Sequence, residues 1–375
     1  MIYLDSAATS LLKPPSVERA MVRALRTCAS PGRGAHKPAM RGAQTVYACR
    51  ETASKIFHVS DPEKIVFTMN ATHGLNIAIS SLVCVGMRVV VSGYEHNAVI
   101  RPLHALRAQI DVAEAPLFDT GGILDAFRRK IPGADAVVCT HVSNVFGYIL
   151  PIEEIAAMCA QEGIPLIVDA SQSAGHLEVD FDAMGAEFIA MPGHKGLMGP
   201  QGTGILLCRN GGEPLLYGGT GSMSKSPDMP ELLPDRLEAG TANVCGIAGL
   251  NAGMEYLLKS GIKAVHGREM LLSDALVKGL DGIHGISVIC PDRSNRTGVV
   301  SVLPEKISCE ELAGRLGSQG VAVRGGFHCA PLAHRTAMTY DTGTVRFSLS
   351  PFNTPQEIEK ALDITEKCLN ISYKM

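Results

Sequence analysis

Short apolar runs of strand length recur along the first part of the chain, and helical stretches separate several of them. The runs cover 65–68, 88–92, 136–140, 165–169, 188–191 and 204–208. They show little alternation of polar and apolar residues, which is typical of strands that are covered on both faces. Because helical stretches such as 152–161 connect such strands, the pattern predicts an α/β domain with a mostly parallel sheet. We expect this large domain to span residues 16–255.

The rest of the chain has a different pattern, in which strands and helices follow one another less regularly. A helix is predicted over 262–280, and strands are predicted over 286–289, 298–303, 321–323 and 344–349. Ser308 and Thr354 each stand three residues before a glutamate, a spacing typical of a helix N-terminus. This order predicts a smaller α+β domain over residues 256–375, with residues 1–15 packed on it.

Composition excludes several classes of protein. The chain has 375 residues, of which 46% are hydrophobic and 19% charged, so it is not a disordered chain. The net charge of −3 leaves no basic excess for nucleic acid or an anionic membrane. Eleven cysteines at irregular spacing, with no visible secretory signal, favour free thiols in a reducing compartment. We therefore expect a cytoplasmic protein that binds neither nucleic acid nor membrane.

Polar side chains follow five of the predicted strands. These segments are 70–74, 94–97, 141–144, 169–172 and 192–195. Ligands of open α/β sheets bind outside the carboxyl ends of the strands. Each segment alone is ordinary, but together they predict a ligand site at one edge of the sheet.

Lys195 and Asp169 carry the most specific chemistry of that edge. Lys195 follows an apolar strand in a glycine-rich segment, where loss of water lowers a lysine pKa and makes the amine available for imine formation. Asp169 ends a neighbouring strand. Pyridoxal phosphate requires both groups, because the amine bonds to it and the carboxylate keeps its ring nitrogen protonated. The alternative is an ordinary solvated lysine beside a loop or capping aspartate.

Other residues of the same edge have two interpretations each. His96 is either a hydrogen-bonded structural residue or a ring that stacks on the cofactor and shares in proton transfer. Thr72 and the amide of His73 lie at a predicted helix start, which is a natural place for a phosphate.

Cys329 lies in a glycine-flanked loop, whereas the other ten cysteines are expected to be buried and inert. Arg324 and His328 could raise the thiolate fraction of Cys329. A metal site of His328, Cys329 and His334 matches no strong zinc spacing, so no metal is expected. Arg346 stands in an apolar strand and needs an acidic partner, either a side chain or a substrate carboxylate.

Taken in order, these segments resemble a known family. The resemblance is to pyridoxal phosphate-dependent enzymes of the class V aminotransferase fold, and among them to cysteine desulfurases and selenocysteine lyases. It runs nearly end to end and rests on the segments 3–9, 95–96, 141–144, 168–172, 193–195, 238–241, 324–330 and 345–348. It implies the type I fold of such enzymes, with a seven-stranded sheet in the large domain.

The resemblance also implies how the cofactor is held. Lys195 would bond to it and move protons, Asp169 would pair with its ring nitrogen, Gln172 would contact the ring hydroxyl, and His96 would stack on the ring. Thr72, the amide of His73 and His194 would hold the phosphate. Thr241 would reach the phosphate of the other subunit, which implies a homodimer with shared sites.

For the reaction, the resemblance implies removal of sulfur from L-cysteine. Asn144 and Arg346 would hold the substrate carboxylate, and Cys329 would take the sulfur as a persulfide while L-alanine is formed. Cys329 and Arg346 are only 17 positions apart, as in the group II enzymes, whose cysteine lies on a short loop and usually needs an acceptor for the sulfur.

Pro192 departs from the family pattern, because many relatives have a serine there that donates a hydrogen bond to the phosphate. Several other functions remain open at this point. They are a selenocysteine lyase or another C–S or C–Se lyase, a class V aminotransferase, a carrier or scaffold protein that kept the fold without catalysis, and a dinucleotide-binding oxidoreductase, although the glycine fingerprint of the last is missing.

Overall fold

The computed structural model describes residues 1–32 and 34–370, and its centre is a sheet of seven strands. Their order across the sheet is β2 (Ile65–Thr68), β8 (Gly204–Cys208), β7 (Phe188–Pro192), β6 (Leu166–Asp169), β5 (Ala136–Thr140), β3 (Arg88–Ser92) and β4 (Gln109–Ala113). Only β8 runs antiparallel to its two neighbours, so the other strands point their carboxyl ends to one edge. The predicted α/β fold with a mostly parallel seven-stranded sheet is confirmed.

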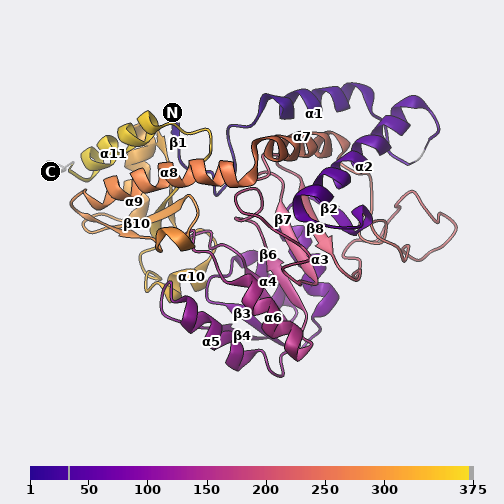
Figure 1. The fold of residues 1–375 in the computed structure, drawn as a ribbon, viewed down its shortest axis with the longest axis horizontal. Coiled ribbons are helices and arrows are strands. Elements are labelled where there is room, and N and C mark those ends of the chain that lie inside the picture. The colour runs from indigo at the N-terminus through magenta and orange to yellow at the C-terminus, as the bar shows by residue number, and fades with distance from the viewer. Residues whose placement is uncertain (33, 371–375) are drawn as a thin grey trace.

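Helices cover both faces of this sheet (Figure 1). They are α2 (Lys37–Phe57), α3 (Ala71–Leu82), α4 (Asn97–Ala105), α5 (Thr120–Lys130), α6 (Ile152–Glu162) and α7 (Val244–Ser260). In β5, Val137 and Cys139 join the core formed with α2, α5, α6 and α7, whereas Ala136 and Val138 join the core formed with α3 and α4. Because alternate residues of the strand enter two different cores, the whole strand is apolar, which explains the runs seen in the sequence.

A second sheet of four antiparallel strands lies beside the first. Its order is β12 (Arg324–Gly326), β13 (Thr344–Ser348), β10 (Val299–Pro304) and β9 (Ile286–Ile289). Helices α8 (Ile262–Asp281), α9 (Cys309–Ser318) and α11 (Pro355–Asn370) pack around it and share a third hydrophobic core with it. The Thr354 Oγ1 accepts from the Glu357 amide and Glu357 accepts from the Thr354 amide, so α11 begins with a reciprocal cap.

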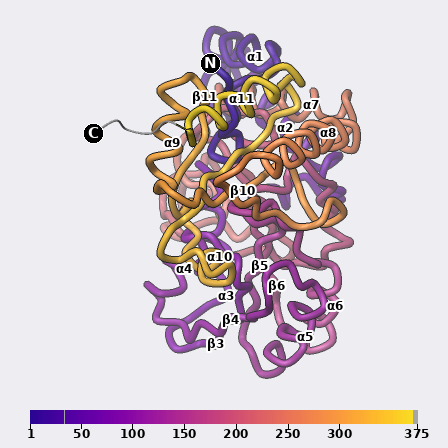
Figure 2. Tube along the Cα trace, turned by 90° about the vertical axis from the view of Figure 1, so that its left-hand side faces the viewer, coloured from indigo at the N-terminus to yellow at the C-terminus, as the bar shows by residue number. Residues whose placement is uncertain are grey.

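The N-terminal residues pack on this second part of the molecule. Strand β1 (Ile2–Tyr3) pairs in parallel with β11 (Val321–Ala322), and the first residues lie beside β11 and α11 (Figure 2). The chain then crosses to α1 (Pro15–Thr27), which packs on α7. This arrangement supports the division into residues 16–255 and residues 1–15 with 256–375, which stays a prediction.

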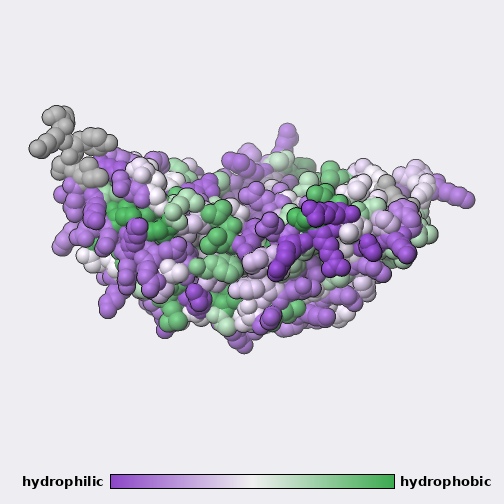
Figure 3. Space-filling model, turned by 90° about the horizontal axis from the view of Figure 1, so that it is seen from above, coloured by the Kyte–Doolittle hydropathy of each residue, from purple (hydrophilic) through white to green (hydrophobic). Residues whose placement is uncertain are grey.

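Among the described residues, no helix is both long and apolar enough to cross a membrane. Seen from above, the surface is mostly hydrophilic and carries separate hydrophobic patches (Figure 3).

Candidate active site

The parallel strands bring the predicted polar residues to one edge of the large sheet. Asp169 is the last residue of β6, and its carbonyl accepts a hydrogen bond from the His141 amide that follows β5 (2.9 Å). Asp169 is 2% exposed, and one of its carboxylate oxygens accepts from the Ser171 amide (2.9 Å). Lys195 lies on the turn after β7, the next strand in the sheet.

The turn that carries Lys195 is tightly packed. The Gly199 amide donates to the Gly193 carbonyl (2.7 Å), and the Met198 amide donates to the Lys195 carbonyl (3.0 Å). A Cβ on Gly196 would lie 2.3 Å from the Ala174 carbonyl oxygen, so only glycine fits beside the lysine. Burial lowers the pKa of Lys195 to about 8; Asp169 counteracts this shift, whereas Arg346 and Arg324 add to it. The sequence-based expectation of a lysine with a lowered pKa is therefore met.

His96 caps helix α4 at this edge. Its Nδ1 accepts from the Ala98 amide (3.0 Å), so the neutral ring carries its proton on Nε2. Burial lowers the pKa of His96 to about 4; Asp169 opposes this shift, while Lys195, Arg324 and Arg346 reinforce it. A half-buried imidazole that is neutral at physiological pH can stack on a ring and exchange a proton at Nε2.

Cys329 lies on the four-residue loop between β12 and helix α10 (Pro331–Thr336). The loop is attached at two points to segments that follow strands of the large sheet. The Cys329 carbonyl accepts from the amide of Asn97, the first residue of α4 (2.8 Å), and the His328 carbonyl accepts from Nδ2 of Asn144, which follows β5 (2.7 Å). Both His328 and Cys329 have positive φ angles, +50° and +58°. The thiol is exposed and free, and the expectation that the other ten cysteines are buried is wrong for Cys84, which is also exposed.

One expectation about this loop is wrong. We expected His328 to raise the thiolate fraction of Cys329, but His328 is buried and its Nε2 contacts the carbonyl and hydroxyl oxygens of Thr344 (3.2 and 3.1 Å). Burial lowers the pKa of His328 to about 2, and Arg346, His334 and Arg324 lower it further. The ring is therefore neutral, and the positive charges near the loop belong to Arg324 and Arg346.

Arg346 is 1% exposed in the middle of β13. Its Nη2 donates to the Asp5 carboxylate (2.8 Å), and its Nη1 donates to the Asn144 carbonyl (3.0 Å). Its Nε is buried and has no hydrogen-bond partner among the described residues. Arg324 stands directly opposite on β12, so two cations face the same region. Sequence reasoning did not assign Asp5 as the partner of Arg346, although a single acid in the apolar N-terminal segment was a signal for it.

The predicted phosphate-binding residues lie on two separate segments, the start of α3 and the turn after β7. Thr72 is exposed on the first turn of α3, and the His73 amide already donates to the Asn70 side chain that caps this helix (2.9 Å). The His194 ring contacts the Thr9 hydroxyl (3.1 Å), and burial lowers the pKa of His194 to about 4. Burial also lowers the pKa of His73.

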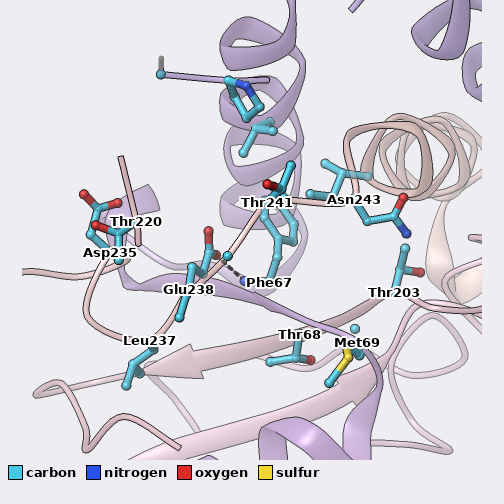
Figure 4. Close-up of a pocket in the computed structure, with 18 of the residues that line it drawn as sticks. Phe67, Thr68, Met69, Thr203, Thr220, Asp235, Leu237, Glu238, Thr241 and Asn243 are labelled. Atoms are coloured by element: carbon cyan, nitrogen blue, oxygen red, sulfur yellow. Dashed lines mark hydrogen bonds between the residues drawn. The ribbon is translucent and has the colours of Figure 1, made fainter. Parts of the chain in front are cut away.

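Two further predicted residues are Gln172 and Thr241. Gln172 is buried after β6, and its Nε2 donates to the Ala7 carbonyl (3.1 Å). Thr241 is exposed and lines a separate cavity of about 520 Å³ (Figure 4). His73 and Glu238 line the same cavity, and Glu238 accepts from the Phe67 amide (2.5 Å) and pairs with Arg50 (2.6 Å). Neither Lys195 nor Asp169 is among the residues that line it.

This donor set fits pyridoxal phosphate and an amino acid bound beside it. The amine of Lys195 has a lowered pKa, a carboxylate ends the adjacent strand, and a neutral imidazole lies at the same edge. The unpartnered Nε of Arg346 leaves a buried donor for a substrate carboxylate. Pro192 ends β7 and supplies neither a hydroxyl nor an N–H for the phosphate.

Comparison with known proteins gives consistent results. The family model described as "Aminotransferase class-V" matches residues 2–361. A "Probable cysteine desulfurase" of Methanothermobacter thermautotrophicus is 35% identical over 96% of this chain and 92% of its own length. A "Cysteine desulfurase" of Cronobacter sakazakii is 32% identical over 96% of this chain and 91% of its own. The solved apo structure of a cysteine desulfurase from Thermococcus onnurineus has a TM-score of 0.89 and 31% identity, covering 98% of this chain and 94% of that one.

Proposed function

The chain belongs to the aminotransferase class-V family, and we propose that it is a cysteine desulfurase that removes sulfur from L-cysteine, leaves L-alanine and holds the sulfur as a persulfide on Cys329. Identity of 30–35% to cysteine desulfurases over nearly the whole chain supports this activity. The observation that carries the role of Cys329 is its exposed thiol on a loop that is hydrogen-bonded to the His96 and Asn144 segments of the site.

Members of this family use pyridoxal 5'-phosphate, and the residues at the sheet edge suit it. Lys195 would bond to the cofactor, Asp169 would face its ring nitrogen, His96 would stack on its ring, and Gln172, His194, Thr72 and His73 would contact its ring hydroxyl and phosphate. When bound, this group acts as an electron sink for the substrate amino acid.

Arg346 and Asn144 orient the substrate in this proposal. Arg346 is held by Asp5 and by the Asn144 carbonyl, so its guanidinium cannot swing away when a carboxylate approaches. A carboxylate on that buried cation directs the substrate side chain toward the loop of Cys329. The neutral Lys195 amine and the Nε2 of His96 are the two groups that can accept or return a proton nearby.

Sulfur transfer would then begin from the thiolate of Cys329, with Lys195 and His96 as the nearby groups that can supply the proton. Its Sγ attacks the substrate sulfur, and an S–S bond forms as the substrate Cβ–S bond breaks. The electron pair of the broken bond stays with Cβ, which takes up a proton and becomes the methyl group of alanine.

We test the proposal with Cys329→Ala and, as a matched control, Cys84→Ala, which removes another exposed thiol. The Cys329 variant should lose sulfide release from L-cysteine by at least about a hundredfold while keeping the visible absorbance band of the bound cofactor. The Cys84 variant should behave as wild type. Full sulfide release by Cys329→Ala would contradict the proposed role, and retained selenium release from selenocysteine in that variant would indicate the lyase instead.

We also propose a homodimer, a sulfur-acceptor protein and a cytoplasmic location. Exposed apolar side chains on α1, α2 and the segment 215–232 support a dimer face next to Thr241; they include Val22, Leu25, Met40, Tyr47, Leu216 and Tyr217. The exposure of Phe327 and Tyr340 near Cys329 supports access for an acceptor. The eleven free cysteines support a reducing compartment.

A further inference from the structure

A histidine and a glutamate join the large sheet to the second part of the molecule. His176 lies on the loop that follows β6, four residues after Gln172, and Glu269 lies on α8. The His176 Nδ1 is 2.8 Å from the Glu269 Oε2. The side chains are 15% and 1% exposed, so the pair is shielded from solvent.

The His176 ring also rests on the turn that carries Lys195. A Cβ placed on Gly196 would lie 2.6 Å from the Cδ2 and 2.8 Å from the Nε2 of His176. A Cβ placed on Gly175 would lie 2.3 Å from the Gly196 carbonyl carbon and oxygen. Two glycines thus allow the His176 loop to touch the backbone next to Lys195, so a shift of His176 is transmitted to both Lys195 and Gln172.

A small cavity of about 10 Å³ adjoins the pair. His176, Glu269, Gln172 and Ser6 are among the residues that line it. The Oε1 of Glu269, the Oγ of Ser6 and the Oγ of Ser173 are buried without a hydrogen-bond partner among the described residues. This volume is about that of one water molecule, and Glu269 and Ser6, which line the cavity, are the residues whose unpartnered oxygens could bind one.

The charges around His176 favour the ion pair. Burial alone would lower the pKa of His176, but the charge and hydrogen bond of Glu269 outweigh burial and raise it, while Lys195 opposes them. His266, one turn before Glu269 on α8, has its pKa lowered by burial, so it stays neutral and leaves Glu269 to His176. The raised pKa of His176 therefore favours the positive form of its ring at this contact with Glu269.

We propose that His176 and Glu269 are positioning residues. They fix the Gln172 loop and the Lys195 turn relative to α8. They thereby fix the amine relative to the part of the chain that carries Arg346 and Cys329. This inference rests on the proposed function, because the reaction needs the amine on one part and the substrate carboxylate and thiol sites on the other. Neither residue touches the reacting atoms.

The test compares Glu269→Gln with Asp180→Asn in the holoenzyme. Asp180 forms a similar pair with His58 (2.7 Å), but that pair is exposed. Glu269→Gln keeps the size and an acceptor oxygen but removes the charge. We expect its kcat for L-cysteine to fall roughly tenfold with KM within about twofold, because misplacement of the amine slows the reaction while Arg346 still binds the carboxylate. We also expect a changed visible circular dichroism of the bound cofactor, and Asp180→Asn should match wild type in both measurements.

A pH series tests whether the ion pair between His176 and Glu269 contributes to stability. The raised pKa of His176 means that the ion pair is fully formed below the unfolded value of 6.5 and is lost as pH rises through the folded value. The Tm difference between wild type and Glu269→Gln should therefore be larger at about pH 6 than at about pH 9. His176→Gln should reproduce the loss of kcat, and the double variant should lose no more than either single variant.

Two results would overturn the inference. If Glu269→Gln and His176→Gln match wild type in kcat and visible circular dichroism, the pair does not position the site, even if Tm falls. If the wild-type protein binds no pyridoxal phosphate, the proposed function fails as well. A coloured, active wild type with unaffected variants therefore refutes only the positioning role.

Discussion

At the scale of single residues, burial sets the protonation states around Lys195. The pKa of about 8 means that half of the amine is neutral at pH 8, where an ordinary lysine is almost fully protonated. His96, with a pKa lowered to about 4, is neutral at the same pH. At pH 8 the edge therefore holds a neutral imidazole and a lysine amine that is half neutral, whereas a solvated lysine would be almost fully protonated.

The lowered pKa predicts how cofactor capture depends on pH. Because only the neutral amine bonds to pyridoxal phosphate, the rate at which the apoprotein gains its visible band should rise with pH and level off above about 8. Arg324→Gln removes a positive charge that lowers this pKa, so it should move the midpoint to higher pH. Stopped-flow absorbance across about pH 6 to 11.5 measures both, and a wild-type midpoint near the ordinary lysine value of 10.5 would contradict the buried amine.

At the scale of elements, the loop between β12 and α10 holds Cys329 in a left-handed conformation. Two consecutive residues other than glycine with positive φ are costly, and the bonds to Asn97 and Asn144 keep the loop in this form. The backbone that carries the thiol is therefore fixed, although the thiol itself is exposed. Attack on a bound substrate requires a nucleophile in such a defined position.

This backbone predicts an unusual order of stabilities. Cys329→Gly and Cys329→Ala both remove the thiol, but glycine adopts φ of +58° without strain, so the glycine variant should be more stable by about 1 kcal/mol. At the neighbouring Ala330, where φ is −133°, a change to glycine should be destabilising. Urea denaturation of the three variants gives the comparison. A Cys329→Gly variant less stable than Cys329→Ala would show that the loop relaxes in solution.

At the scale of the whole molecule, the site combines residues from both sheets, and the proposed dimer would add Thr241 from a second subunit. In this chain Thr241 lines a cavity whose wall contains His73 but neither Lys195 nor Asp169. In the proposed dimer, the exposed apolar side chains near Thr241 would be covered by the second subunit.

Mixed dimers test this sharing of sites. Lys195→Ala and Thr241→Ala should each be impaired alone at limiting cofactor. After exchange of subunits, half of the dimers contain one chain of each variant. Each of these hybrids has one of its two sites free of both substitutions. About a quarter of the wild-type activity should therefore return. Light scattering should give twice the chain mass of 39.7 kDa. If dimers shown to contain both chains recover no activity, Thr241 contributes either to the site of its own chain or to no site.

Local sequence determined the strands and many helix ends. Six apolar runs became β2, β3, β5, β6, β7 and β8 because each is buried on both faces, and Thr354 begins α11 through a cap within four residues. Strand β4 was not predicted, because it lies at the sheet edge, where Gln109 and Asp111 interrupt the apolar pattern. Motif order, together with the strand ends, also sufficed to predict Lys195, Asp169 and the cofactor.

Tertiary structure alone decided which groups meet. Asp5 reaches Arg346 across 341 positions, Asn97 binds the Cys329 carbonyl, and Glu269 on α8 reaches His176. Packing also made His328 neutral, whereas its position next to Cys329 in the sequence had suggested that it would act on the thiol by its charge. The physical reason is that strand and helix formation depends on near neighbours in the chain, whereas ion pairs and pKa values depend on distance and burial, which only the packed fold defines.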